Sequence, residues 1–248
     1  MRLTILGSSG GYAGPQSSCS GYLVEHAATR LWLDAGNGTF GGLQRAIGDF
    51  RQVDTIVLSH VHADHCSDLL TYYVALRYDD NGPLRRRLYC PQETWDRVAG
   101  FLQAGEDFRQ TFDFQPIDAG DTVEVGGLRL SFLRMDHPVH TLGVRLEDDE
   151  QKVLTYSADT YLGADLTSFA RGSDLLLCEA TYQEEAQGGP VHLTARQAAE
   201  TAVRAGAGRL LLTHLWPTLD PERSLEEARA AAGEIEVRLA LPGEAHEV

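Results

Sequence analysis

The segment TIVLSHVHADH, residues 55–65, places an apolar run directly before four side chains that can bind metal. The run TIVL has the composition of a buried strand. If the residues after it stay extended, alternate side chains point to the same side, so His60 and His62 can hold one ion together. The chain then turns into a predicted helix, which redirects Asp64 and His65 toward a second ion. Burying so many polar groups without a shared partner is costly, so this segment predicts a metal centre.

Further candidate ligands follow other apolar runs of the chain. His137 comes after LRLSFLRM, Asp159 after KVLTYS and His214 after RLLLT. We expect these loops to meet at one edge of the sheets, where they would complete the site. Imidazole nitrogens and carboxylate oxygens suit Zn²⁺, and they also accept Mn²⁺ or Fe²⁺. We therefore expect two divalent metal ions per chain, with Zn²⁺ as the first choice.

Length and charge narrow the class of protein. A chain of 248 residues with 43% hydrophobic content can fold as one domain over residues 1–248. The formal net charge of −15 argues against general binding to nucleic acid and favours a small substrate. The N-terminus does not have the pattern of a signal peptide, and no apolar run reaches the ~20 residues that span a membrane. We expect a cytoplasmic protein whose four separated cysteines stay reduced: Cys19, Cys66, Cys90 and Cys178.

Short apolar runs alternate with helical stretches along the chain. The predicted strands are Leu3–Leu6, Gly21–Glu25, Leu31–Asp34, Thr55–Ser59, Leu128–Met135, Leu142–Leu146, Val153–Ser157, Asp174–Cys178 and Leu210–Thr213. The predicted helices lie near residues 66–78, 92–104, 195–205 and 221–232. In the third of these, Thr194 and Gln197 have the spacing of a capping box and Gly206 can end the helix. Asp79–Arg87 is predicted as an exposed loop, and the mixed order favours packed sheets covered by helices, an α/β fold.

At this point the sequence resembles the metallo-β-lactamase superfamily, whose HxHxDH motif matches residues 60–65. Within that superfamily it is most similar to the ribonuclease Z-like and cyclic-nucleotide phosphodiesterase-like branch. The matching segments are GSSGG (7–11), LDAGNGT (33–39), HPVHTLGVR (137–145), YSADT (156–160), CEATY (178–182) and LLTH (211–214). The resemblance spans nearly the whole chain, and it implies an αββα four-layer sandwich with a two-metal site.

The resemblance also implies a role for each motif residue. His60, His62 and His137 would hold one ion, Asp64, His65 and His214 the other, and Asp159 would bridge the two. His192 would act as an acid or stabilise the transition state, with Glu179 orienting it. The expected catalytic residues are therefore Asp64, Asp159, Glu179 and His192. The alternative for His192 is a cap at the start of the following helix, although Thr194 already has capping chemistry.

Several neighbouring residues receive weaker interpretations. Asp34 is expected to accept a hydrogen bond from a ligating histidine, and Ser8 and Ser9 to line the substrate entrance. The glycines of GSSGG are explained equally well by a tight turn and by phosphate binding. His140 departs from the proline common in related sequences and receives no role. His26 and His246 are interpreted as ordinary surface or hydrogen-bonded residues.

The resemblance favours a hydrolase that acts as a phosphodiesterase on a small phosphodiester such as a cyclic nucleotide. No insertion matches the protruding arm with which ribonuclease Z holds transfer RNA. The alternatives are an RNA 3′-processing nuclease, a sulfatase or a thioester or lactone hydrolase on the same scaffold, and a non-catalytic metal-binding regulatory module. The complete set of ligand candidates argues against the last. Relatives commonly dimerise, so a homodimer is compatible with the resemblance.

Overall fold

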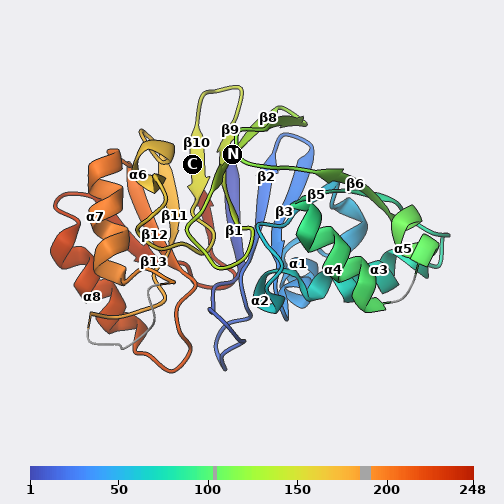
Figure 1. The fold of residues 1–248 in the computed structure, drawn as a ribbon, viewed down its shortest axis with the longest axis horizontal. Coiled ribbons are helices and arrows are strands. Elements are labelled where there is room, and N and C mark those ends of the chain that lie inside the picture. The colour runs from blue at the N-terminus through green and yellow to red at the C-terminus, as the bar shows by residue number, and fades with distance from the viewer. Residues whose placement is uncertain (103–104, 185–190) are drawn as a thin grey trace.

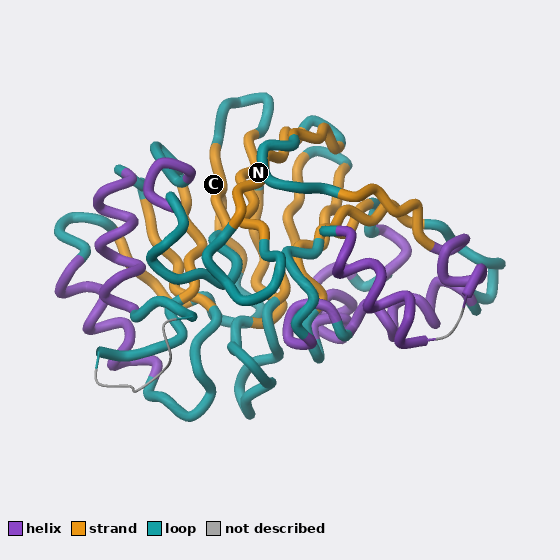
Figure 2. Tube along the Cα trace, viewed as in Figure 1, coloured by secondary structure: helices purple, strands orange, loops and turns teal. Residues whose placement is uncertain are grey.

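Two seven-stranded sheets pack face to face in the computed structural model, which describes residues 1–102, 105–184 and 191–248. Helices cover the outer side of each sheet, as Figure 1 shows for α7 and α8 on one flank and α1, α3 and α4 on the other. In Figure 2 the orange strands occupy the middle and the purple helices both flanks. The αββα four-layer sandwich that the resemblance implies is therefore confirmed.

The first sheet has the strand order β14-β1-β2-β3-β4-β5-β6. β2 runs antiparallel to both of its neighbours, β1 and β3, whereas β3 to β6 are parallel. The last strand of the chain pairs with the first, and Val248 N donates to Met1 O at 3.0 Å. The strands are β1 (Arg2–Gly7), β2 (Gly21–His26), β3 (Thr29–Ala35), β4 (Thr55–Val57), β5 (Arg86–Cys90), β6 (Phe112–Pro116) and β14 (Ala245–Glu247).

The second sheet has the order β13-β12-β11-β10-β9-β8-β7. β7 to β10 are antiparallel neighbours, and β10 to β13 are parallel strands with helices between them. The strands are β7 (Thr122–Val125), β8 (Leu128–Arg134), β9 (Leu142–Glu147), β10 (Val153–Tyr156), β11 (Leu175–Glu179), β12 (Arg209–Thr213) and β13 (Glu236–Leu239). The connecting helices are α6 (Leu166–Phe169), α7 (Ala195–Ala205) and α8 (Pro221–Ala231).

Three apolar layers hold the sandwich together. The central core lies between the sheets and includes Leu31, Leu130 and Leu177, all fully buried. A second cluster joins the second sheet to α7 and α8, and a third joins the first sheet to its own helices. Those helices are α1 (Thr39–Ile47), η1 (Phe50–Gln52), α2 (Ala63–Cys66), α3 (Asp68–Arg77), α4 (Gln92–Leu102) and α5 (Gly105–Thr111).

The structure agrees with most predicted elements and corrects two of them. The capping box of Thr194 and Gln197 is present at the start of α7, and Gly206 ends that helix in the left-handed conformation. The helix predicted near residues 66–78 is two helices, α2 and α3, and α2 begins within the ligand motif. The loop predicted at Asp79–Arg87 ends in β5, which starts at Arg86. Residues 103–104 of the helix predicted near 92–104 lie outside the described residues.

The described helices are short, and the cysteines are free. The longest have 11 residues, and none of the described helices is long and apolar enough to cross a bilayer. All four cysteines are buried free thiols in the structure.

The topology brings polar segments together at one edge of the sandwich. Candidate site residues lie at or just after the ends of the parallel strands β3 and β4 of one sheet and β10, β11 and β12 of the other. Carboxyl ends of parallel strands are the usual place for ligand sites in α/β folds. The fold therefore predicts one functional site, built from both sheets.

We predict that Leu31→Ala lowers the free energy of unfolding by about 2–5 kcal/mol, because it leaves a cavity in the central core. Leu162→Ala is the control: Leu162 is 51% exposed, so its loss should change stability by about 0.5 kcal/mol or less. Urea titration measures both variants. Equal midpoints for Leu31→Ala and the unmodified protein would contradict the assignment of Leu31 to the core.

Candidate metal centre

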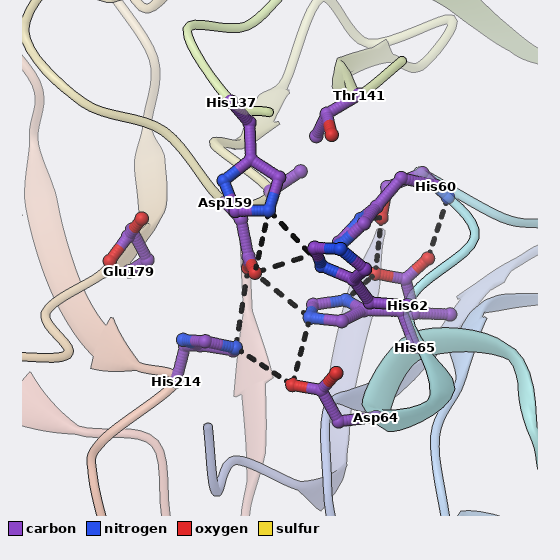
Figure 3. A network of polar contacts seen from close by, with 12 residues as sticks. His60, His62, Asp64, His65, His137, Thr141, Asp159, Glu179 and His214 are labelled. Carbon is purple, nitrogen blue, oxygen red and sulfur yellow. Dashed lines mark hydrogen bonds and ion pairs between the residues drawn. The ribbon is translucent and has the colours of Figure 1, made fainter. Parts of the chain in front are cut away.

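Two groups of four ligand side chains share one carboxylate at the sandwich edge. In each group the ligand atoms lie within 4.8 Å of one another. The first group contains His60, His62, His137 and Asp159, and the second contains Asp64, His65, Asp159 and His214. All seven predicted ligands are therefore brought together (Figure 3). They lie in the segments that follow β4, β8, β10 and β12, and two of them, Asp64 and His65, belong to α2.

Asp159 presents a different oxygen to each group. Its Oδ2 lies 3.6 Å from His60 Nε2 and 3.8 Å from His137 Nε2. Its Oδ1 lies 3.2 Å from His65 Nε2 and 3.3 Å from His214 Nε2. Asp159 would therefore be shared by both groups if each held a cation.

The remaining ligands complete each group. His62 Nδ1 lies 3.1 Å from His137 Nε2 in the first group. Asp64 Oδ2 lies 3.1 Å from His214 Nε2 and 3.5 Å from His65 Nε2 in the second. Each group thus gathers nitrogen and carboxylate ligands at short range, a donor set that suits Zn²⁺.

Three buried atoms of the centre have no hydrogen-bond partner. They are His60 Nε2, His65 Nε2 and Asp159 Oδ1. Buried polar atoms are normally paired, so three orphans that face one another point to a missing partner. Metal ions between these atoms would satisfy all three, and the residues present therefore fit a binuclear metal site.

Hydrogen bonds behind the rings decide which nitrogen faces the centre. The Asp34 carboxylate, fully buried at the end of β3, lies 2.7 Å from His65 Nδ1. Ser59 Oγ donates to Asp34 at 2.8 Å, and so it can accept from His60 Nδ1 at 3.0 Å. With these protons placed on Nδ1, the Nε2 lone pairs of His60 and His65 are free for metal.

A second buried carboxylate does the same for His214. Thr181 Oγ1 donates to Glu179 Oε2 at 2.8 Å and lies 2.8 Å from His214 Nδ1. Because the threonine proton goes to the carboxylate, its oxygen accepts from His214. Nε2 of His214 is then the ligand atom.

The charges of the centre favour a bound cation. Burial raises the pKa of Asp159, but the neighbouring His214 and His65 outweigh it and hold that pKa well below its usual range. Burial lowers the pKa of His65, yet the carboxylates of Asp159, Asp64 and Asp34 raise it well above the ordinary value. A positive charge beside these carboxylates is therefore stabilised, and bound metal ions would supply it.

The three rings of the first ligand group favour their neutral form. Burial lowers the pKa of His60 well below its ordinary value, and burial also lowers the pKa of His62 and His137. A neutral ring has the lone pair that coordination needs.

His192 lies beside both groups and is held by Glu179. Its ring centroid is 5.3 Å from that of His137 and 5.1 Å from that of His214. Its Nδ1 lies 2.9 Å from Glu179 Oε1. Burial lowers the pKa of His192, but the hydrogen bond and charge of Glu179 outweigh it, so the pKa is raised. Thr194 caps the start of α7, so His192 is not the cap of that helix. Gly188, Gly189 and Pro190, which come shortly before His192 in the sequence, lie outside the described residues.

The other histidines stay outside the centre. His140 Nε2 lies 3.0 Å from Asp118, His26 pairs with Asp149 and His246 lies near Glu244. None of the three belongs to a metal-binding group among the described residues.

Three supporting residues were not predicted from the sequence. Ser59 and Thr181 are described above, and Tyr156 OH donates to Asp34 Oδ2 at 2.8 Å. Each of the three residues lies inside or next to one of the sequence motifs, and that position was the only sequence signal for its role. Ser8 and Ser9, predicted at the substrate entrance, are buried in the turn after β1.

We predict that Asp34→Asn weakens the binding of both metal ions by about 10–100-fold, the usual effect of losing a partner that orients ligands. Asparagine keeps the shape of the side chain and tolerates the left-handed backbone of residue 34, φ 55°. It cannot accept hydrogen bonds on both side-chain atoms as a carboxylate does. Competition with a chromogenic chelator measures the affinity. Asp54→Asn, at an exposed loop position, is the control and should bind like the unmodified protein. Unchanged affinity in Asp34→Asn would show that Asp34 has no part in metal binding.

Comparison with known proteins agrees with this geometry. A family model described as "Beta-lactamase superfamily domain" matches residues 29–215. The chain is 38% identical over 237 residues to the "Uncharacterized protein Rv1339" of Mycobacterium tuberculosis, covering 93% of this chain and 86% of the relative. It is 27% identical over 262 residues to a ribonuclease Z of Methanopyrus kandleri, covering 92% of this chain and 91% of the relative.

Solved structures show the same fold. The crystal structure of YhfI from Bacillus subtilis, whose sequence is named a probable metallo-hydrolase, matches with a TM-score of 0.88 and 25% identity over 99% of both chains. A diphosphatase of the PhnP family matches with a TM-score of 0.81 and 18% identity, over 100% of this chain and 97% of its own. Zn²⁺-bound PqqB from Methylobacterium extorquens matches with a TM-score of 0.78 and 19% identity over 100% of both chains. The chain therefore belongs to the metallo-β-lactamase superfamily, in the branch that contains YhfI and ribonuclease Z, and it is a metal-dependent hydrolase with a buried His/Asp metal site.

Proposed function

We propose that this protein hydrolyses a small phosphodiester, such as a cyclic nucleotide, with two divalent ions, preferably Zn²⁺. The observation that carries the proposal is the Glu179–His192 pair beside the two metal groups. Hydrolysis at phosphorus needs charge neutralisation and a proton for the leaving oxygen, and these two features supply both. Ribonuclease Z and the PhnP-family diphosphatase, among the similar proteins, are also named for cleavage of phosphate compounds.

Each ligand group would hold one of the two ions. His60, His62 and His137 would hold one ion, Asp64, His65 and His214 the other, and Asp159 would lie between them. Two such ions supply Lewis-acid charge to the phosphoryl oxygens and make water a better nucleophile near neutral pH. The side chains fix the positions of that charge, because their rear nitrogens are bound by Asp34, Ser59 and Thr181.

His192 would supply the proton. Its Nδ1–H is committed to the Glu179 carboxylate, which leaves Nε2 as the atom that can donate to substrate. Water would add to phosphorus and lose a proton to solvent, the bond to the leaving oxygen would break, and that oxygen would take the proton from Nε2. His192 would regain a proton from solvent before the next turnover. Glu179 does not reach substrate in this scheme. It is a positioning residue, held fully buried by Thr160 N and Leu193 N.

RNA 3′-end processing is the second candidate, because of the identity with ribonuclease Z over nearly the whole chain. The net charge of −15 weighs against a long polyanion. A small phosphodiester avoids most of that repulsion.

A substrate panel tests the proposal. We expect Zn²⁺-loaded protein to hydrolyse bis(4-nitrophenyl) phosphate and at least one cyclic nucleotide, and to leave precursor transfer RNA uncut. Nitrophenyl sulfate, a thioester and a lactone are the comparison substrates. Preference for one of these, or efficient processing of the transfer RNA, would replace the proposed substrate. Failure with every substrate would favour a non-catalytic metal-binding module.

We predict that His192→Ala lowers kcat for a cyclic nucleotide by roughly 10²–10⁴-fold, the usual contribution of a general acid, with little change in metal content. The loss for bis(4-nitrophenyl) phosphate should be clearly smaller, because nitrophenolate leaves without needing a proton. His140→Ala is the matched control, since His140 lies outside both ligand groups. Equal losses on both substrates would mean that His192 only positions substrate, and loss of bound metal would make it a ligand.

A further inference from the structure

The turn after β1 packs against the chain that carries His214. Leu215 N donates to Ser8 O and Gly10 N donates to Leu215 O, both at 2.9 Å. His214 itself has a left-handed backbone, φ 54°, which is uncommon for a residue other than glycine. The turn therefore holds the chain next to a ligand whose backbone is strained.

Gly10 lies against the ring of His214. A Cβ added at Gly10 would come within 2.6 Å of His214 Nδ1 and 2.7 Å of His214 O. The ring cannot move aside freely, because the same Nδ1 is bound by Thr181 Oγ1 at 2.8 Å. Any side chain at position 10 would thus displace the ligand or the turn.

Gly11 binds the other end of the same group. Its backbone N–H donates to Asp64 Oδ2 at 2.7 Å, a short bond to a charged acceptor. That oxygen is also the one 3.1 Å from His214 Nε2 and 3.5 Å from His65 Nε2. The Gly11 amide therefore orients the carboxylate atom that faces the second ligand group.

The contacts are confined to one of the two groups. For the described glycines, no atom of His60, His62 or His137 is among the nearest neighbours of an added Cβ. A tight turn alone would explain Gly7, whose added Cβ would meet the backbone oxygen of Cys19 at 2.1 Å. A tight turn does not explain why the successive residues Gly10 and Gly11 contact two ligands assigned to the same ion.

We propose that Gly10 and Gly11 are positioning residues for the second metal ion, the one assigned to Asp64, His65 and His214. This inference rests on the two-ion site of the proposed function. Gly10 leaves room for the His214 ring, and the Gly11 amide fixes Asp64 Oδ2. The first ion, at His60, His62 and His137, does not depend on this turn.

Stepwise removal of zinc tests the inference. Zn²⁺-loaded Gly10→Ala should release one ion at about 10–100-fold lower chelator concentration than the unmodified protein, and the other ion at the same concentration. Ser9→Ala is the control within the turn, since it removes only the bond from Ser9 Oγ to Ser17 O. Gly100→Ala is the control in open space on α4. Both controls should release both ions as the unmodified protein does.

Three results would overturn the inference. These are equal weakening of both ions in Gly10→Ala, no weakening of either, and the same selective loss in Ser9→Ala. Unmodified protein that holds a single ion would overturn the two-ion site as well, so failure of the proposed function is distinguishable.

A second measurement needs no variant and decides the matter if Gly10→Ala does not fold. In protein labelled with ¹⁵N-glycine, removal of one ion should shift the amide signal of Gly11 strongly, and removal of the other should not. Gly233, in the turn before β13, should not respond to either ion, because β13 begins opposite Arg209, at the end of β12 away from His214. A Gly11 signal that ignores both ions, or follows both equally, would contradict the assignment.

Discussion

The buried carboxylate of Asp159 sets the constraint on which the site depends. It is 2% exposed and faces imidazole nitrogens of both ligand groups at 3.2–3.8 Å. A buried carboxylate is costly unless it is paired, with an effective penalty of about several kcal/mol per ion in proteins. Two bound cations would meet that requirement. The other ligands stand at strand ends from both sheets, so the face-to-face packing of the sheets is what creates the centre.

Two buried carboxylates support the ligand groups: Asp34 serves a histidine of each group, and Glu179 serves one of the second group. Asp34 fixes His65 directly and His60 through Ser59, whereas Glu179 fixes His214 through Thr181. Glu179 also binds His192 with its other oxygen. One carboxylate thus orients a metal ligand and the proposed acid, which couples the position of the proton donor to that of the second ion.

Much of the fold and the ligand set was predictable because its signals are local. Apolar runs marked strands such as β10 and β12, and the HxHxDH spacing marked the centre. The pairing of β14 with β1 was not predictable, since it joins the two ends of the chain. The same applies to the supporting contacts: Thr181 meets His214 across 33 positions and Gly11 meets Asp64 across 53. Glycine in GSSGG signals a turn from its sequence, and only the folded chain shows which side chain lies against it.

Anomalous diffraction from crystals of the Zn²⁺-loaded protein, recorded at the zinc absorption edge, is the most direct test of the binuclear centre. The account predicts two peaks about 3.5–4 Å apart, one on each side of the Asp159 carboxylate. One peak should lie among His60, His62 and His137, and the other among Asp64, His65 and His214. A single peak at full occupancy, or a pair that leaves Asp159 without a metal contact, would contradict it.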